Sequence, residues 1–595
     1  MANLVRPVNL LPPAEERIIE FKGLNRRTTV AEGEMSDMLN LSSDDYPVLT
    51  PRKPRGQLRL PSGVVRPLRL MAKFEKIALI ARTNDGVAFY YDGVKIDAVD
   101  DLSESTQMVG INTKICFFPE RTYLEISPEG VPGEYGSLEL SVSVPSGAAV
   151  TINAYNTLVE IPHGSGIKYD DAITIDGTLA YGSSSREISV VCLVEDIVEG
   201  NETDTLYLPA NTFIEIVGEG VTSASLLGAT ITKGDVPRLD HVVEWNNRLW
   251  GTKSDDNTIY ACKLGDPTNW QYYQGTSLDS YYAEQGTDGK WTGVATFSSH
   301  IMFFKENSIC RVYGTSPSNY QISTMDAFGV ESGSRQSVIT INDTVYYKSR
   351  IGIMAYTGSA PVCISDGFNC EFMGVVAGTE KRKYYASCHK KGSGYELMVF
   401  DTEKGLWHKE DNTRFRSCAT IGDKLYYVAY TEDVMTCSDT LYCSDWLLVG
   451  SGDSEGYVGI VNPVKAEEDP NTLEWMAQFG PFDEYLEEHK IYSKLALRVL
   501  APNASDNILV DENDEELMDD QVNAFAIPRW MKVYISIDEG PWEQVELYEP
   551  PGTRGDFIPI VPRRCDRYSV KVEAQGKYEI KSLTRRVRKG SFGRL

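Results

Sequence analysis

Apolar, aromatic-rich strands alternate with short polar turns through the middle of the chain, and this pattern returns at a regular interval. Each repeat is one such strand, a turn and a second such strand. The repeats are RLWGTKSDDNTIYACKLGDPTNW (248–270), HIMFFKENSICRVYG (300–314), TVYYKSRIGIMAYTG (344–358), KYYASCHKKGSGYELMVFDTEKGLWHKE (383–410) and KLYYVAYTEDVMTCSDTLYCSDWLLVG (424–450). Their starts lie 52, 44, 39 and 41 residues apart, close to the roughly 40–50 residues of a four-stranded propeller blade. The pattern therefore predicts an all-β chain with a β-propeller core.

The same pattern predicts where other domains interrupt or follow the propeller. Two early hairpins (76–93 and 113–126) assign residues 66–126 to the first blades, and the remaining blades occupy 237–463. Between them, residues 127–236 are rich in Val, Ile, Thr, Ser and Gly and contain no Trp, which predicts an inserted β-sandwich. Residues 464–595 contain a clear hairpin (530–549) and alternating strands, which predict a C-terminal β-sandwich domain with a basic tail.

Residues 1–65 contain turn formers, two basic steps next to proline and little strand periodicity. Such a segment is either a frayed terminus or an extended chain on a neighbouring surface. Its apolar side chains favour an extended docking segment: Leu24, Met35, Met38, Leu41, Tyr46 and Leu49.

Tryptophans recur beside turns of the repeats, at 250, 270, 291, 407 and 446. Packing between successive blades is the more frequent use of such a side chain, and a sugar-binding platform is the alternative. We expect them to pack one sheet on the next.

The chain has 595 residues, so two to four domains are expected. Its formal charge is −27 and its pI is near 4.8. A protein that binds DNA tightly through its phosphates needs a basic surface, so this charge disfavours ordinary nucleic-acid binding. An acidic surface instead keeps a large assembly soluble, or lines a passage that repels DNA.

Eleven cysteines are scattered along the chain without a C-x-x-C pair, and several lie within aromatic strands. They are interpreted as small buried hydrophobic side chains in a protein made in a reducing cytoplasm. The beginning MANLVRPVNLLPP does not have the pattern of a secretory leader, and no apolar run approaches the ~18 residues of a membrane span.

The motifs of enzymes and metal proteins are missing from the sequence. It contains no P-loop and no H-E-x-x-H, and the Gly-rich stretch GSGDSEG (450–456), which includes one G-x-S-x-G match, is interpreted as a loop. No catalytic, cofactor-binding or metal-binding residue is therefore nominated. SIDEGPW (536–542) resembles the Asp-box of sialidases but is one residue short before Trp542, and an Asp-box is a structural turn. DENDEE (511–516) lacks the glycine of an EF-hand loop and is read as a solvated acidic loop.

The last fifteen residues, KSLTRRVRKGSFGRL, are basic in an otherwise acidic chain. Such a tail contacts an acidic neighbouring subunit or nucleic acid, or it is a solvated strand edge protected by charge. The basic residues are Lys581, Arg585, Arg586, Arg588, Lys589 and Arg594.

Two stretches resemble one known family. GLNRRTTVAEGEMSDMLNLSSDDYPVLTPRKPR (23–55) looks like an N-terminal phrase with a G-x-N opening, G-E-x-x-D-x-x-N-L and a basic, proline-containing stop. VEWNNRLWGTKSDDNTIYACKLGDPTNW (243–270) looks like a blade with N-R-L-W-G and G-D-P-x-N-W, except that Cys262 stands where a small residue such as Ser is usual. The family is the tail nozzle, also called tail hub or packaged-DNA stabilisation protein, of short-tailed bacteriophages.

This resemblance implies a structural virion protein without enzymatic activity or cofactor. It implies a homo-oligomeric ring, a hexamer, that continues the DNA channel below the portal and adaptor and seats tail fibre proteins. The packaged DNA would pass the acidic lumen without sequence-specific contact, be retained until infection and then exit. The protein would be assembled in the host bacterial cytoplasm and reside in the virion tail.

Two other functions remain open from the sequence. The first is a tail-tip receptor-binding or glycan-binding protein, which should expose tyrosine clusters in the domain at 127–236. The second is a propeller glycosidase, which needs two carboxylates some 5–10 Å apart across a cleft.

Overall fold

The computed structural model describes residues 14–233, 236–391, 394–430, 456–463, 468–483, 490–500, 529–548 and 554–588, together with residue 466. The chain forms two compact units. The first consists of residues 1–60, 352–355 and 362–595, and the second of residues 61–351 and 356–361. Within the described residues nearly all regular structure is β-strand, with one four-residue α-helix, Ile214–Val217 (α1).

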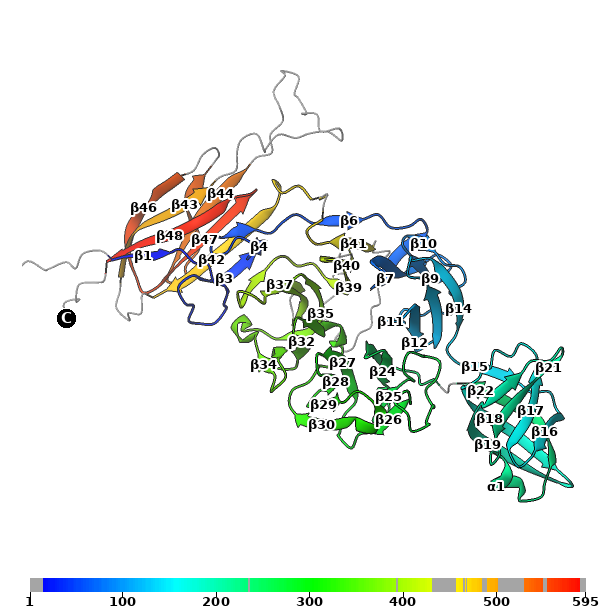
Figure 1. Ribbon diagram of the computed structural model, residues 1–595. Helices are drawn as coiled ribbons and strands as arrows, with labels where there is room; N and C mark the ends of the chain where they lie inside the picture. The colour runs from blue at the N-terminus through cyan, green and yellow to red at the C-terminus, as the bar shows by residue number, and fades with distance from the viewer. Residues whose placement is uncertain are drawn as a thin grey trace, which may run out of the picture. The chain divides into compact units, whose positions relative to one another are not determined.

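The second unit contains four consecutive four-stranded antiparallel sheets in which each strand pairs with the next along the chain (Figure 1). Such an up-and-down sheet is the blade of a propeller. The first blade consists of β7 (Val64–Lys73), β8 (Lys76–Thr83), β9 (Gly86–Tyr91) and β10 (Val94–Lys95), and the second of β11 (Gln107–Ile111), β12 (Lys114–Phe118), β13 (Thr122–Ile126) and β14 (Pro132–Ser137). The third blade consists of β23 (His241–Trp245), β24 (Arg248–Thr252), β25 (Thr258–Ala261) and β26 (Tyr281–Glu284). The fourth consists of β27 (Trp291–Phe297), β28 (His300–Lys305), β29 (Ser308–Tyr313) and β30 (Gln321–Asp326).

The aromatic runs that mark the repeats are the second strands of these sheets. Strands β24 and β28 are buried at every position, and β12 is buried from Ile115 to Phe118. A strand buried on both faces has no polar side to alternate with its apolar side, so its sequence is a continuous apolar run. This explains why KICFF and HIMFFK stand out in the sequence.

Apolar clusters join each sheet of the second unit to the next. Phe89 meets Phe117 edge to face at 5.3 Å, and Phe118 packs in one cluster with Leu249 and Trp270. Trp250 and Trp291 belong to the following cluster. The prediction that tryptophans pack one sheet on the next is confirmed for these residues, while Trp446 lies outside the described residues.

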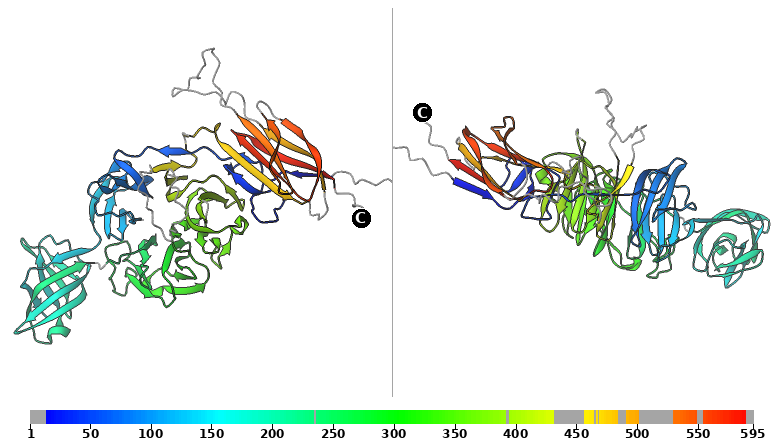
Figure 2. Two further views of the ribbon diagram at one scale, coloured as in Figure 1. Left: turned by 180° about the vertical axis from the view of Figure 1, so that it is seen from behind. Right: turned by 90° about the horizontal axis from the view of Figure 1, so that it is seen from above.

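The inserted domain is one eight-stranded sheet, in which β22 (Ser223–Lys233) pairs with β18 (Ala172–Tyr181) on one side and with β15 (Leu140–Ser143) and β16 (Ala148–Ile152) on the other (Figures 1 and 2). One face of its strands is buried and the other is exposed. All the buried side chains meet in a single cluster, so the sheet curls around its own core. Its other strands are β17 (Asn156–Pro162), β19 (Ser184–Leu193), β20 (Asp196–Val198) and β21 (Thr203–Pro209).

The insertion begins later than the sequence pattern predicts. Residues 132–137 form β14, the fourth strand of a blade, so the predicted boundary at 127 falls within that sheet. Strand β14 contains two glycines and a proline and has no buried position. It therefore lacks the apolar pattern by which the other blade strands were found.

The division between the units falls at residues 352–361. Strands β31 (Ile339–Ile341) and β32 (Thr344–Ser349) pair in the second unit, and β33 (Gly352–Tyr356) pairs with β34 (Val362–Cys363).

The first unit contains two further blade sheets. One comprises β35 (Phe372–Glu380), β36 (Lys383–Lys390), β37 (Tyr395–Asp401) and β38 (Leu406–Lys409). The other comprises β39 (Phe415–Ile421), β40 (Lys424–Tyr430), β41 (Gly456–Ile460) and, as its fourth strand, β6 (Gly56–Leu58). The N-terminal part of the chain thus completes a sheet whose other strands come from far along the sequence.

The C-terminal domain of the first unit has two layers (Figure 2). One sheet has the order β1 (Ala14–Ile18), β48 (Glu579–Arg588), β43 (Lys490–Leu500), β46 (Arg554–Cys565). The other has the order β2 (Gly23–Leu24), β3 (Glu34–Leu39), β42 (Glu474–Phe482), β47 (Tyr568–Gln575), β44 (Trp530–Ile537), β45 (Glu543–Tyr548). Tyr492 and Tyr568 stack between the layers with ring centroids 4.0 Å apart. The predicted all-β fold class with propeller-type sheets is confirmed. The C-terminal domain has the two layers of a sandwich, whereas the insert, for which a sandwich was predicted, is a single curled sheet.

Candidate functional site

The N-terminal segment is built into the first unit at several places. We call residues 21–58 the anchor segment. Strand β3 pairs with β42, Leu49 bridges to Ile580, and β6 pairs with β41. Five of the six apolar residues that favoured docking are buried, and Tyr46 is 36% exposed. The anchor segment therefore packs within its own unit, where it connects a blade sheet and both layers of the C-terminal domain.

Gly23 opens the family phrase and can be only glycine at this place. Its φ is +92°, and a Cβ atom would lie 2.3 Å from the carbonyl oxygen of Trp407. The backbone therefore approaches β38 more closely than any side chain allows. Two residues on, Asn25 donates to the Glu34 carboxylate at 2.6 Å, and the same carboxylate accepts the Ala31 amide.

Arg26 fastens the phrase to the blade that contains Glu396. Its guanidinium forms a forked pair with Glu396 at 2.8 and 3.0 Å and a third bond with Asp37 at 3.0 Å. Burial by itself would lower the pKa of Arg26, but these two carboxylates raise it. Burial likewise opposes ionisation of Glu396, and Arg26 outweighs it, so the pKa of Glu396 is lowered.

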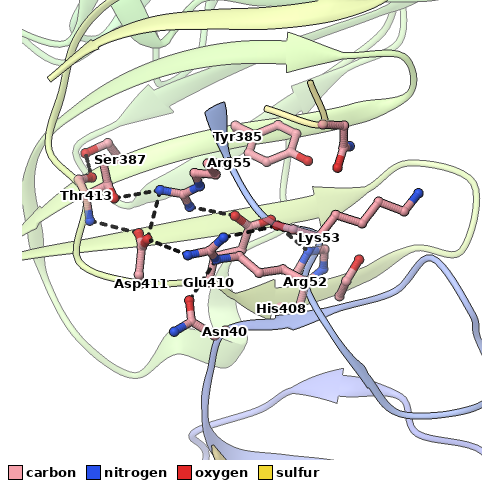
Figure 3. Close-up of polar contacts among 12 residues, drawn as sticks. Asn40, Arg52, Lys53, Arg55, Tyr385, Ser387, His408, Glu410, Asp411 and Thr413 are labelled. Carbon is pink, nitrogen blue, oxygen red and sulfur yellow. Dashed lines mark hydrogen bonds and ion pairs between the residues drawn. The ribbon is translucent and has the colours of Figure 1, made fainter. Parts of the chain in front are cut away.

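The basic, proline-containing stop of the phrase ends in a buried ion-pair cluster (Figure 3). Arg52 forms a forked pair with Glu468 at 2.7 and 2.8 Å and donates from Nε to Asn40 at 2.8 Å. Arg55 contacts Glu410 at 2.7 Å and Asp411 at 2.8 Å. Both arginine side chains are less than 10% exposed.

Two acids of the cluster, Asp411 and Glu468, have lowered pKa values although both are partly buried. Burial favours the neutral form of Asp411, but Arg55 and Arg52 outweigh burial and lower its pKa. The same balance, with Arg52 as the main partner, lowers the pKa of Glu468. Each of these arginines is paired with acids from another part of the same unit, so the cluster connects the anchor segment to residues 410–411 and 468.

A small cavity lies beneath the anchor segment, lined by Met38, Leu41, Leu49, Leu406 and His408 among others. Its volume is about 10 Å³, enough for about one water molecule and far below the roughly 300 Å³ of a small ligand site. His408 is buried, and neither ring nitrogen has a hydrogen-bond partner among the described residues. Burial lowers the pKa of His408 to about 3, so the ring is neutral.

The second family motif fastens the inserted domain to the third blade of its unit. In GDPTNW, Asp266 accepts hydrogen bonds from Thr268 and Asn269. The Asn269 side-chain oxygen accepts the Ala172 amide of the insert at 3.4 Å, and Lys263 pairs with Asp170 at 2.7 Å.

Arg248 of the N-R-L-W-G strand is fully buried and donates to backbone carbonyls. These belong to Cys262 (2.7 Å), Ser277 (2.6 Å), Leu278 (3.3 Å) and Asp279 (2.5 Å). The departure at Cys262 fits this core, because its sulfur accepts the Leu249 amide at 3.1 Å. Burial raises the pKa of the Cys262 thiol to about 12.

The cysteines agree only in part with the prediction that they are buried, because Cys192, Cys363, Cys370 and Cys418 are partly exposed. All nine in the described residues are free thiols, and Cys116, Cys262, Cys310, Cys388 and Cys565 are buried. Cys437 and Cys443 lie outside the described residues.

The Asp-box-like turn and the acidic loop that stood out in the sequence differ in whether the structure describes them. The Asp-box-like turn joins β44 to β45, and Asp538 accepts the amides of Asp566 and Arg567. The acidic loop 511–516 lies outside the described residues. Within the part of the chain that the structure describes, no group of three or more His, Cys, Asp or Glu could hold a metal, and no helix could span a membrane.

The basic tail begins as an inner strand. Strand β48 lies between β1 and β43, so the interpretation of this part as a strand edge is wrong. Arg585 is buried, pairs with Glu32 at 3.1 Å and lies over the Phe482 ring, and Arg586 contacts Glu15 at 3.3 Å. Arg585 and Arg586 therefore form their ion pairs within the first unit. Lys589 and Arg594 lie outside the described residues.

Comparisons with known proteins place the chain in no family. No family model matches it, and no curated protein matches it. Solved structures align over long stretches at low similarity. Hsv2 of Kluyveromyces lactis covers 48% of this chain and 71% of its own at 12% identity, with a TM-score of 0.23.

Two enzymes align at the same level. The endosialidase of phage phi92 covers 84% of this chain and 80% of its own at 10% identity, with a TM-score of 0.23. An exo-β-1,3-galactanase of Phanerochaete chrysosporium covers 58% and 95% at 11% identity, with a TM-score of 0.20. At these scores the alignments carry no argument about function.

Proposed function

We propose that the protein is a structural component of a bacteriophage tail. It forms a nozzle or hub ring, a homohexamer, that continues the DNA channel below the portal and adaptor, retains the packaged genome and lets it exit at infection. It catalyses no reaction. The proposal rests on the family phrase at 23–55 and the blade motif at 243–270.

The observation that supports it best is what these motif residues do. Gly23, Arg26, Arg52 and Arg55 all join the anchor segment to the rest of its unit. Arg248 and Asn269 organise a blade and fasten the insert. Motif residues that hold parts of the fold together suit a structural component. An acidic chain of net charge −27 also offers DNA few favourable phosphate contacts, so DNA would slide past it.

Two experiments test this proposal. Electron microscopy of the purified protein with its portal and adaptor should show six-fold rings on the portal axis, and a protein that stays monomeric beside them contradicts the ring. Virions assembled without the protein should lose their DNA, and normal DNA retention contradicts the role in genome retention.

A receptor-binding role for the insert is the second candidate, because the insert displays exposed tyrosines. Tyr155 is 90% exposed and Tyr169 is 67% exposed. The hairpin turn that carries Tyr155 is held by Asn153, whose side-chain oxygen accepts the amides of Tyr155 and Asn156. Virions with Tyr155→Ala should adsorb more slowly to host cells if this role holds, and unchanged adsorption contradicts it.

A further inference from the structure

An exposed aromatic surface lies on the third blade of the second unit, outside the inserted domain. Tyr273 is 48% exposed and Tyr282 is 62% exposed, and their rings meet edge to face with centroids 6.0 Å apart. Tyr260 lies directly opposite Tyr282 on the neighbouring strand. Leu278, also exposed, belongs to the same loop as Tyr273. We call Tyr260, Tyr273, Leu278 and Tyr282 the tyrosine patch.

The loop that carries half of this patch is held from below and from within. The buried Arg248 guanidinium binds the carbonyls of Ser277, Leu278 and Asp279. The Asp279 carboxylate accepts the amides of Gln274, Gly275 and Thr276 at 2.7–3.1 Å. The fold of 273–279 is therefore fixed before any ligand arrives, which removes most of the ordering cost of binding.

The Tyr273 ring is held by a hydrogen bond, and the backbone of Tyr282 is held by its strand. The hydroxyl of Tyr273 donates to the Trp270 carbonyl at 3.4 Å, and Tyr282 belongs to β26. Two rings at 70° to one another form a corner. The negative face of an aromatic ring attracts C–H bonds that carry partial positive charge, such as those on the face of a pyranose.

The polar side chains around the patch suit sugar hydroxyls. Gln274 and Ser277 are exposed on the loop, and Glu284 is exposed on the same face of β26 as Tyr282. An amide, a hydroxyl and a carboxylate together supply both donors and acceptors of hydrogen bonds.

Size and charge narrow the ligand. Aromatic side chains carry about 150–250 Å² each, so the exposed parts of this patch amount to roughly 200–300 Å². This is well below the ~800 Å² that each partner contributes to a stable protein interface, and it suits a few sugar rings. Glu284 and the net charge of −27 disfavour a phosphate-bearing or uronic-acid ligand.

We propose that the tyrosine patch is a binding site for a neutral saccharide, in which pyranose rings stack on Tyr273 and Tyr282. The site is independent of the proposed ring function, and a tail protein would use it to hold a surface glycan of the host. It is also distinct from the inserted domain, where the sequence led us to expect a glycan.

Saturation-transfer NMR on the full-length protein tests this proposal. The probes are maltohexaose and cellohexaose, with an oligogalacturonate of the same length as the charged comparator. At least one neutral hexasaccharide should receive saturation at its ring protons, and the oligogalacturonate should receive much less. The proposal is overturned if neither neutral sugar receives saturation at about 10 mM, which is ten times a millimolar Kd. It is also overturned if the oligogalacturonate receives as much saturation as the neutral sugars.

Variants locate the site. Tyr282→Ala and Tyr273→Ala should each weaken binding by tenfold or more, and Tyr282→Phe should stay within about threefold because the ring remains. Phe74→Ala, which removes an exposed aromatic ring in the turn between β7 and β8 of the same unit, is the control and should change nothing. Binding that survives both patch variants overturns the assignment.

Assembly is measured on the same samples by sedimentation. The patch variants should assemble as the unaltered protein does. If they lose self-association in place of sugar binding, the patch is a contact between copies of the chain, and the saccharide proposal is wrong while the ring proposal stands.

Discussion

Removing the charge of Arg55 should detach the end of the anchor segment. Arg55 contacts Glu410 at 2.7 Å, Asp411 at 2.8 Å and the Thr413 hydroxyl at 2.7 Å, and its side chain is 9% exposed. The Glu410 side chain is only 5% exposed. In Arg55→Met this carboxylate stays buried without its main partner.

The expected magnitude follows from burial. Breaking a buried ion pair by removing one partner costs about 3–5 kcal/mol, because the remaining charge is left uncompensated. Arg52 still lies 3.7 Å from Asp411, so the lower end of that range applies. A loss of about 3 kcal/mol corresponds to a roughly hundredfold increase in the population of the detached state.

Hydrogen exchange measured by mass spectrometry reads this state directly. Strand β6 begins one residue after Arg55 and pairs with β41 through Gly56, Gln57 and Leu58. Its amides exchange when the segment detaches, so their exchange should accelerate about a hundredfold in Arg55→Met. Amides of the insert should not change.

Two companion variants make the test decisive. Arg382 and Glu403 form an ion pair in the same unit with both side chains more than half exposed, so Arg382→Met should change exchange less than about fivefold. Arg55→Lys keeps the positive charge but has one nitrogen in place of the two that contact Glu410 and Thr413. Its effect on the exchange of β6 should fall between those of Arg55→Met and Arg382→Met. If Arg55→Met accelerates β6 no more than Arg382→Met does, the buried cluster does not hold the segment and the reasoning is refuted.

Three further predictions concern other residues. The folded protein keeps His408 neutral because burial lowers its pKa to about 3, whereas in the unfolded chain the ring takes up a proton near its ordinary pKa of 6.5. This contribution to the free energy of unfolding is present above pH 6.5 and falls by about 2 kcal/mol between pH 6.5 and 5. Urea unfolding should show that the free energy of unfolding of His408→Gln depends less on pH than that of the unaltered protein. An equal pH dependence of the two would contradict this. Gly23→Ala places a Cβ atom 2.3 Å from the Trp407 carbonyl at a φ of +92°. It should strongly raise the amide hydrogen exchange of β2 and β38. Gly405→Ala is the control for backbone strain without a clash, because its Cβ would meet nothing within 4 Å. Asn269→Ala removes the acceptor of the Ala172 amide and should make trypsin cut between the insert and the third blade several times faster, and an unchanged cutting rate would show that the turn does not fasten the insert.

The sequence predicted the fold where burial leaves a visible pattern. The second strands of the blades are buried on both faces, so their aromatic runs could be counted. Strand β14 could not be found, because Gly133, Gly136 and Pro132 in an unburied strand resemble a loop. The short strand β6 could not be assigned either, since its partner β41 lies roughly 400 residues further on, and three residues carry no periodicity.

The candidate site was predicted only in part. The apolar residues of the anchor segment showed that it docks, but the acids that hold it were hidden among 85 acidic residues. Glu396, Glu410 and Glu468 are distinguished only by burial beside arginines. The tyrosine patch was missed because the sequence alone does not distinguish an exposed tyrosine from a buried one. Tyr272, for example, is buried, while its neighbour Tyr273 is exposed.

The place of β6 also sets an order for biosynthesis. The ribosome makes Gly56–Leu58 roughly 400 residues before Gly456–Ile460, and at about 5–20 residues per second this interval lasts roughly 20–80 s. During that time the first-made strand must wait without its hydrogen-bonding neighbour, exposed to chaperones and proteases. A polypeptide whose translation stops before Gly456 lacks β41, so its β6 has no strand of this sheet to pair with.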